Sequence, residues 1–272
     1  MKFCDLHIHS SFSDGKLTPE EIVSTARNKG VKCISITDHD TLDAQYITNN
    51  KYDDLDVIPG IELSTEVNGI EIHILGYFID IENENLKKVL TELKFYRKER
   101  AKSIVSKLNK MGIDIDISEV LKNGKETVGR ANIALEIVKK GYECNYKTAF
   151  NKYLVQGKPA YEKGKKLTYK EAIKLIINSK GIAVLAHPGK IYKAREVENI
   201  IKELRCYGLK GIEVYHNSHT KEQINKFYNL SKKYKMVVTG GSDFHCCLSE
   251  CEIGSEGIDS ELYEKFIGAK NK

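Results

Sequence analysis

Asp5-Leu6-His7-Ile8-His9, at the start of the chain, combines the pattern of a short apolar strand with two imidazoles. Residues 10–15 are turn formers that end this strand. Residues two apart in a strand point to the same side, so His7 and His9 share one face and can bind a metal ion together. Asp14, just past the turn, is a third ligand candidate. Two ordinary surface or core histidines would give the same local pattern, so the rest of the chain has to decide.

The composition is that of a globular protein. With 41% hydrophobic and 30% charged residues over 272 positions, we expect one large domain or a domain with an insertion. No apolar stretch approaches the roughly 18 residues that would span a bilayer, and Met1 leads into a strand without a signal-peptide pattern. The seven cysteines are an odd number without framework spacing. We therefore expect reduced thiols, a cytoplasmic location and no membrane partner.

Charge is distributed unevenly along the chain. Residues 83–166 carry 20 Lys and Arg against 10 Asp and Glu, a net charge of +10, whereas the remainder carries 23 against 28, a net charge of −5. This asymmetry indicates a metal-binding body beside a basic part that receives anions. A solvated, lysine-rich helical surface would give the same counts.

Strand and helix signals alternate on both sides of residues 83–166. A Thr followed three residues later by Glu, at Thr18 and Thr168, predicts capped helix starts, and Asn68-Gly69 is typical of a hairpin turn. Such alternation predicts a parallel sheet, and the number of strands suits a barrel. Between the two parts, helical periods with abundant lysine predict a mainly helical insertion. The expected strands are 3–8, 31–37, 56–67, 70–78, 182–186, 211–215 and 236–239, and the expected helices include 18–30, 168–180, 195–207 and about fifteen residues after Thr220.

Side chains that can bind metals gather where these strands end. The carboxyl ends of the strands form the catalytic face of a βα barrel. Chance could place one or two such residues there, but hardly all of them. The sequence therefore predicts a polynuclear metal site. The residues are His7, His9, Asp38, His39, His187, Glu213, His216, Asp243 and His245.

Five motifs together resemble those of the PHP (polymerase and histidinol phosphatase) family. They run from residue 5 to residue 245 in the family's order, so the resemblance covers nearly the whole chain. The branch that is most similar contains phosphoesterases acting on 3′,5′-bisphosphate nucleotides and on the 5′ ends of short RNA. The motifs are Asp5-Leu6-His7-Ile8-His9 with Ser13-Asp14-Gly15, Thr37-Asp38-His39-Asp40, Gly60-Ile61-Glu62, Ala186-His187-Pro188-Gly189 and Gly241-Ser242-Asp243-Phe244-His245.

The resemblance implies an α/β fold: a distorted seven-stranded (β/α)7 barrel built from residues 1–82 and 167–272. Residues 83–166 would form an inserted, helical, basic subdomain that binds substrate. The resemblance also implies three metal ions, with Glu62 bridging the first two. The implied ligands are His7, His9, Glu62 and Asp243 for the first ion, Glu62, His73 and His187 for the second, and Asp14, His39 and His245 for the third.

These ligands define the expected chemistry. Imidazole and carboxylate without thiolate suit Mn²⁺, Fe²⁺ or Zn²⁺, of which we favour Mn²⁺. Ions roughly 3.5–4 Å apart can share a hydroxide and clamp the oxygens of a phosphate ester. We therefore expect hydrolysis of the 3′-phosphate of nucleoside 3′,5′-bisphosphates, release of nucleotides from the 5′ ends of short single-stranded RNA, or both. Asp38 is expected to orient an imidazole or the nucleophile.

Fewer signals bear on substrate contacts. His219, which is outside the implied ligand set, can contact a substrate phosphate or donate a proton to the leaving oxygen; an ordinary loop histidine is the alternative. Arg130 matches an Arg in a motif that usually reads Gly-Arg-Pro-His, but Ala131 and Asn132 replace the Pro and the His here. We count Arg130 and Asn132 as candidate substrate contacts, together with Lys158 and Tyr161, where the insertion rejoins the barrel.

Three alternative functions remain open at this stage. A histidinol-phosphate phosphatase would share the reaction, although its first motif usually differs from residues 10–15. A processive nuclease would suit the basic insertion. A non-catalytic PHP module of a polymerase assembly would tend to lose ligands, whereas every expected ligand is present. Cys246, Cys247 and Cys251 follow the last predicted ligand, and we expect free thiols there rather than an added thiolate metal site.

Overall fold

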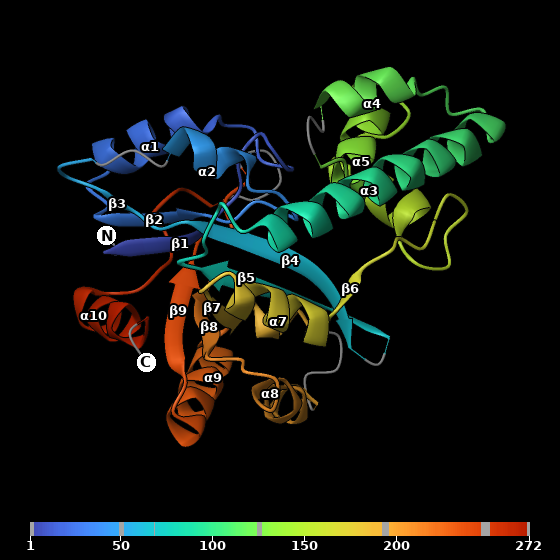
Figure 1. Cartoon of the computed structure of the whole chain (residues 1–272). Coiled ribbons are helices and arrows are strands. Elements are labelled where there is room, and N and C mark those ends of the chain that lie inside the picture. Colours follow the sequence, from blue (N-terminus) through green and yellow to red (C-terminus); the bar gives the residue numbers. More distant parts are fainter. Residues whose placement is uncertain are drawn as a thin grey trace.

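The computed structural model describes residues 3–48, 52–67, 69–123, 127–191, 196–245 and 251–270. Its strands form two sheets (Figure 1). The first contains β1 (Cys4–Ile8), β2 (Cys33–Ile36) and β3 (Asp56–Val57), all parallel. The second has the order β6-β4-β5-β7-β8-β9 and is mixed, because β5 is antiparallel to both β4 and β7. Its strands are β4 (Gly60–Val67), β5 (Ile70–Tyr77), β6 (Leu167–Thr168), β7 (Ile182–Leu185), β8 (Gly211–His216) and β9 (Val237–Gly241).

The two sheets meet at two places, and both are beside predicted metal ligands. An isolated parallel bridge pairs Ile8 with Phe244, and another pairs His39 with Glu62. Hydrogen bonds from Asp243 N to the carbonyl oxygen of His7 (2.8 Å) and from His9 N to that of Phe244 (3.0 Å) continue the first junction. Among the described residues these short junctions do not close the strands into the seven-stranded barrel that we expected. The structure is an α/β fold with a mixed sheet.

The expected strand 56–67 is two strands, which is a second difference from the sequence-based picture. Asp56–Val57 belongs to the first sheet and Gly60–Val67 to the second. Pro59 lies between them and has no N–H to donate to a ladder, so the pairing is interrupted there. The predicted hairpin between β4 and β5 is present, with Val67 opposite Ile70; Asn68 of its turn lies outside the described residues.

Helices cover both sheets on their outer sides. The predicted capping boxes form: Thr18 and Glu21 exchange hydrogen bonds at the start of the first helix, and Thr168 and Glu171 do the same further along. A final helix that the sequence analysis missed is capped by Asp259 and buries Phe266. Helices α1 and α2 lie beside the first sheet, and α7 to α10 surround the second (Figure 1). The helices are α1 (Pro19–Asn28), α2 (Asp43–Thr48), α7 (Tyr169–Asn178), α8 (Val197–Arg205), α9 (Lys221–Tyr234) and α10 (Ser260–Ala269).

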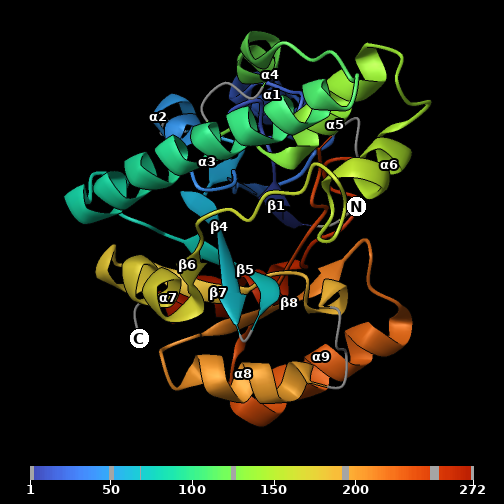
Figure 2. The ribbon, with the colours of Figure 1, turned by 90° about the vertical axis from the view of Figure 1, so that its right-hand side faces the viewer.

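The described elements between residues 84 and 154 are all helical, and the buried side chains between residues 101 and 160 form a cluster separate from those of the sheets. Figure 2 shows the longest of these helices, α3, running across the top of the molecule above β4 and β5. No helix among the described residues is long and apolar enough to cross a membrane. The elements are α3 (Glu84–Lys110), α4 (Ile117–Asn123), α5 (Arg130–Lys139), α6 (Tyr146–Ala149) and a π-helical turn, Phe150–Leu154.

Candidate metal centre

The side chains implied as metal ligands lie together at one end of the strands. His7, Glu62 and His73 lie within β1, β4 and β5, and the other side chains lie in the loops that follow β1, β2, β7 and β9. Their carboxylate oxygens approach the imidazole nitrogens to between 2.9 and 3.9 Å. The set that converges is His7, His9, Asp14, His39, Glu62, His73, His187, Asp243 and His245.

The first group contains two imidazoles and two carboxylates. His7 Nε2 and His9 Nε2 are 3.1 Å apart. Glu62 Oε2 is 3.3 and 3.2 Å from these two nitrogens, and Asp243 Oδ1 is 3.4 and 3.2 Å from them. A tetrahedral ion with bonds of about 2.0–2.2 Å holds its ligand atoms roughly 3.3–3.5 Å apart. The atoms of His7, His9 and Asp243, which all lie within 4.8 Å of one another, therefore fit a divalent metal, with Glu62 Oε2 next to both imidazole nitrogens.

Glu62 also joins this group to a second one. Its Oε1 is 2.9 Å from both His73 Nδ1 and His187 Nε2. Its Oε2 is 3.0 Å from His39 Nδ1, in addition to the first group. One carboxylate therefore faces imidazoles on both of its oxygens, which is the arrangement that a bridging ligand needs. The resemblance had implied His39 for the third ion alone.

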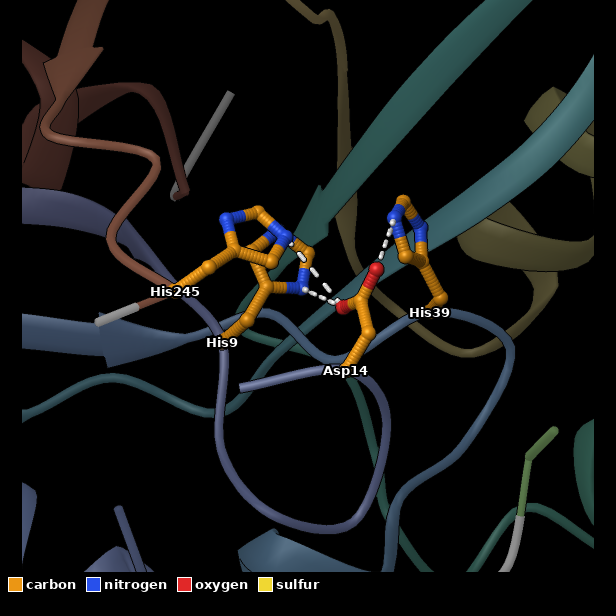
Figure 3. A group of neighbouring side chains, drawn as sticks. All are labelled: His9, Asp14, His39 and His245. Atoms are coloured by element: carbon orange, nitrogen blue, oxygen red, sulfur yellow. Dashed lines mark ion pairs between the residues drawn. The ribbon is translucent and has the colours of Figure 1, made fainter. Parts of the chain in front are cut away.

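Asp14 lies at the centre of a third group (Figure 3). Its Oδ1 is 3.2 Å from His245 Nε2 and 3.7 Å from His9 Nδ1, and its Oδ2 is 3.9 Å from His39 Nε2. The rings of His9 and His245 stack with their centroids 4.1 Å apart. His9 thus presents one nitrogen to the first group and the other to the third.

Two buried atoms of this cluster have no hydrogen-bond partner among the described residues: Glu62 Oε2 and His39 Nδ1. Burying a polar atom without a partner is unfavourable, and more so for an ionised carboxylate. A divalent cation between the ligands would supply that partner. Imidazole and carboxylate donors without thiolate suit Mn²⁺, Fe²⁺ or Zn²⁺, so the residues fit the implied metals.

The pKa values of the cluster also favour a bound divalent cation. Burial alone would raise the pKa of Glu62, but the charges of His39 and His73 outweigh it and hold that pKa well below its usual value. Burial alone would lower the pKa of His9, but the neighbouring carboxylates of Asp243 and Glu62 outweigh it and raise the pKa to about 10. The carboxylates are therefore ionised at neutral pH and attract positive charge.

Glu213, on β8, holds two of the candidate ligands in place. Its Oε1 is 2.9 Å from His7 Nδ1, and its Oε2 accepts the backbone N–H of His187 over 2.6 Å. A carboxylate on the far nitrogen of a metal-binding imidazole fixes the orientation and tautomer of the ring. Sequence analysis placed Glu213 among the strand-end residues but gave it no such role.

Asp38 contacts a turn rather than an imidazole. It accepts hydrogen bonds from Ser10 N (2.7 Å), Ser10 Oγ (2.5 Å) and Ser13 Oγ (2.6 Å). The turn that carries Asp14 is therefore tied to the end of β2. Gly15 completes it, because a Cβ there would lie 2.1 Å from the carbonyl oxygen of His9. The predicted role of Asp38 in orienting an imidazole or the nucleophile stays a prediction.

Asp5 stabilises the junction at which β9 approaches β1. It accepts hydrogen bonds from the backbone N–H and the hydroxyl of Ser242, at 2.9 and 2.6 Å, and from Gly254 N at 2.8 Å. Gly241 lies so close to β1 that a Cβ would be 2.4 Å from His7 N. The close approach of β9 to β1 is what brings Asp243 to the first group.

Three residues in or beside this region have strained backbone conformations. Positive φ angles occur at Asp40 (53°), His187 (24°) and Asp243 (50°), none of which is glycine. Such conformations cost of order 1–3 kcal/mol each and persist where surrounding contacts enforce them. At His187 and Asp243 they direct side chains from two different loops into the cluster, whereas Asp40 binds Arg97 and Ser64 N.

His219 does not reach the ligand cluster with a free nitrogen. Its Nδ1 is 2.9 Å from the carbonyl oxygen of Val214, and its Nε2 accepts the N–H of Gly189 over 3.0 Å. Burial lowers its pKa. These contacts fix the loop after His187. The expected contact of His219 with substrate stays a prediction, and it would require one of these bonds to break.

A cavity opens from the metal-ligand cluster toward the insertion. Asp14, His39 and His73 line one side of it. The other side is basic and comes from α3, α5 and the segment before β6. An aromatic wall of Tyr146 and Phe150 completes it. The basic residues are Arg97, Arg100, Arg130, Lys165 and Lys166.

Of the predicted substrate contacts, Arg130 lines this cavity and the others do not. Its guanidinium carbon is 5.4 Å from the Phe150 ring centroid and 5.9 Å from that of Tyr161. Asn132 is buried and accepts the N–H of Gly129 over 2.8 Å, so it caps α5. Lys158 is exposed to solvent. Roles in substrate binding for Asn132, Lys158 and Tyr161 stay predictions that this placement does not support.

Sequence analysis missed four of the cavity's cations. Arg97 and Arg100 lie on α3 at the i, i+3 spacing that places two side chains on one face. Arg97 donates to Asp40 through Nε over 2.9 Å and through Nη2, so the insertion is tied to the loop after β2. That spacing was visible in the sequence, but nothing local distinguished it from a solvated lysine-rich helix. The other two missed cations are Lys165 and Lys166.

The cysteine prediction is tested only in part. Cys251 is a free thiol whose sulfur accepts a hydrogen bond from Asn217 Nδ2 over 2.9 Å. Cys246 and Cys247 lie outside the described residues. No group of metal-binding side chains found among the described residues includes a cysteine.

A family model and several known proteins are similar to this chain over most of its length. The profile of the PHP domain matches residues 5–214. A 5′-3′ exoribonuclease of Haemophilus influenzae is 34% identical over 96% of this chain and 98% of its own length. A 3′,5′-nucleoside bisphosphate phosphatase of Chromobacterium violaceum is 30% identical over 89% of this chain and 86% of its own. A solved structure from Bifidobacterium adolescentis, described as a metal-dependent phosphoesterase, has a TM-score of 0.88 with 26% identity and covers 98% of this chain and 96% of its own.

Proposed function

Because the chain belongs to the PHP domain family and is a metal-dependent phosphoesterase, we propose that it removes the 3′-phosphate of nucleoside 3′,5′-bisphosphates. The single observation that carries this proposal is the cavity. At one end it is lined by His39, His73 and Asp14, and at the other by five cationic side chains. A substrate with two phosphates would place one at each end.

The proposed metal ligands are the nine side chains of the three groups described above. When bound, divalent cations supply a water of lowered pKa and neutralise the oxygens of the phosphate under attack. We propose up to three ions, with Mn²⁺ favoured. Glu213 orients His7, and the turns held by Asp38 and Asp5 keep Asp14 and Asp243 in place.

The second phosphate would bind to the guanidinium groups. Arg130 and Arg100 come from different helices and line the same cavity. Burial, together with the charges of Arg130 and Arg97, lowers the pKa of Arg100 to about 10. Crowded cations of this kind repel one another, so an incoming dianion that neutralises them is strongly favoured. A planar guanidinium also matches two phosphate oxygens at once.

A phosphate-release screen tests the proposal. The Mn²⁺-loaded protein is offered nucleoside 3′,5′-bisphosphates, nucleoside 5′-monophosphates, histidinol phosphate and short 5′-phosphorylated RNA. We expect the bisphosphates to be hydrolysed with the highest kcat/KM. Preference for histidinol phosphate would contradict the proposal, because that substrate leaves the second subsite empty.

Nucleotide release from the 5′ end of short RNA is the second candidate function. The Haemophilus influenzae relative, 34% identical, has this activity in its name. A 5′-terminal nucleotide of RNA also carries a phosphate on each side of its ribose, so the same two subsites would serve. The RNA arm of the screen decides whether one chain performs both reactions.

A further inference from the structure

Glu71, on β5, is an acidic residue in the otherwise basic part of the cavity. Its Oε2 is 2.7 Å from Lys166 Nζ and 3.6 Å from Arg130 Nη2. Its Oε1 is 3.5 Å from Nε2 of His73, whose Nδ1 faces Glu62. The carboxylate therefore lies between the predicted metal ligands and the cations that would hold a second phosphate.

A negative charge at this point would repel phosphate. It would be tolerated, however, if the part of the substrate that lies there is not a phosphate. In a 3′,5′-bisphosphate the two phosphates are joined through the ribose, so the sugar must lie between the two subsites. The 2′-hydroxyl is on the carbon next to the one that bears the 3′-phosphate. It would therefore face the end of Glu71 that is nearer to His73.

The two oxygens of Glu71 are used unequally. Oε2 is engaged by Lys166 and lies near Arg130, whereas the described contact of Oε1 is a long one, to His73. An ionised carboxylate oxygen accepts only and can take more than one hydrogen bond. Oε1 thus has capacity left for a hydroxyl donor from the cavity.

We propose that Glu71 accepts a hydrogen bond from the ribose 2′-hydroxyl and so selects ribonucleotides over deoxyribonucleotides. This inference rests on the proposed function. A carboxylate that binds ribose hydroxyls is a recurrent device in nucleotide sites, and the 2′-hydroxyl is the group by which a protein distinguishes RNA from DNA. The ligand class is a ribonucleoside phosphate, whether free or at the 5′ end of RNA.

The test compares kcat/KM for adenosine 3′,5′-bisphosphate and its 2′-deoxy analogue. For the wild type we expect a preference of roughly 10-fold or more for the ribonucleotide, the range for one hydrogen bond to a charged group. Glu71→Ala should reduce this ratio to near one, and Glu71→Gln, which can still accept through its amide oxygen, should reduce it partly. The matched control is Glu66→Gln: Glu66 is opposite Glu71 in the β4–β5 ladder, is 3.8 Å from Lys163 and does not line the cavity.

Two further measurements separate the other roles of Glu71. Calorimetry with the two products, adenosine 5′-monophosphate and 2′-deoxyadenosine 5′-monophosphate, should show tighter binding of the ribonucleotide. Glu71→Ala should lose this difference in affinity. Metal content should be unchanged in Glu71→Gln. A variant that loses metal would show that Glu71 only orients His73, and equal losses on both substrates would show that it only neutralises Lys166 and Arg130; either result overturns the inference.

The outcomes for the wild type keep this inference distinct from the proposed function. If the wild type hydrolyses both bisphosphates equally well, the proposed function stands and ribose recognition by Glu71 is wrong. If it hydrolyses neither bisphosphate, the proposed function is wrong and the inference about Glu71 falls with it.

Discussion

Lys190 donates a hydrogen bond from Nζ to Asp243 Oδ2 over 2.5 Å, and His216 Nε2 is 3.1 Å from the same oxygen. The other oxygen of Asp243 faces His7 and His9. The two oxygens of one carboxylate are thus divided between a proposed metal and a pair of supporting groups. Lys190 lies on the short helical turn that follows His187, so it also couples that ligand to Asp243.

Lys190→Met should therefore weaken the first proposed metal site. Without the ammonium, Asp243 is free to rotate, and loss of a supporting contact typically lowers metal affinity by roughly 10- to 100-fold. Competition with a coloured chelator measures the effect. Lys180→Met is the matched control, because Lys180 is an exposed lysine that pairs with a carboxylate, Asp80, over 3.0 Å and contacts no candidate ligand among the described ion pairs. Unchanged affinity in Lys190→Met would show that His216 alone positions Asp243.

Metal stoichiometry tests the ligand groups as a set. The first group shares Glu62 with the second and His9 with the third. With three such groups, we expect more than two transition-metal ions per chain after growth in metal-rich medium. Elemental analysis of the purified protein gives the number. A reproducible value of one or fewer, with full activity, is incompatible with three ions.

Local patterns in the sequence predicted most of the residues that the structure brings together in the cluster. His7 and His9 follow from strand alternation, and Thr18 and Thr168 from capping chemistry, because each signal depends on residues within a few positions. The sequence does not show how close two segments lie in space when they are far apart in the chain. That His9 serves two groups, or that His39 approaches Glu62, is decided by the two junctions between the sheets.

The same limit explains where the structure differs from the expectations or adds to them. Closure of a barrel depends on pairing between strands far apart in the chain, and Pro59 splits one expected strand between two sheets. Asn132 is expected to contact substrate on the basis of its place in a motif; its side chain caps α5, and the substrate contact stays a prediction. Arg97 and Arg100 were passed over because their helical spacing is equally typical of a solvated surface.

Asp14 should be essential for turnover but not for the fold. It is the only carboxylate of the third group and contacts neither Glu62 nor His187 among the described ion pairs. Asp14→Asn should lower kcat by roughly 10²- to 10³-fold, as for the loss of one group that stabilises a developing oxyanion. Thermal unfolding and metal content report on the fold and on the remaining ions. Near-normal turnover would rule out an essential third ion.

Arg130 supplies the sharpest test of how the two ends of the cavity are used. Its guanidinium packs over Phe150 and lines the same cavity as His39 and His73. Arg130→Ala should lower kcat/KM for a nucleoside 3′,5′-bisphosphate by roughly 10- to 100-fold, since one charge-assisted contact contributes about 1.5–3 kcal/mol. It should barely change hydrolysis of a simple ester with one phosphate. Arg205→Ala is the control, because Arg205 stacks 4.8 Å from the ring centroid of Tyr234 and does not line the cavity. Equal losses on both substrates would place Arg130 at the phosphate under attack, and no loss on either would mean that it is an ordinary solvated residue at the start of α5.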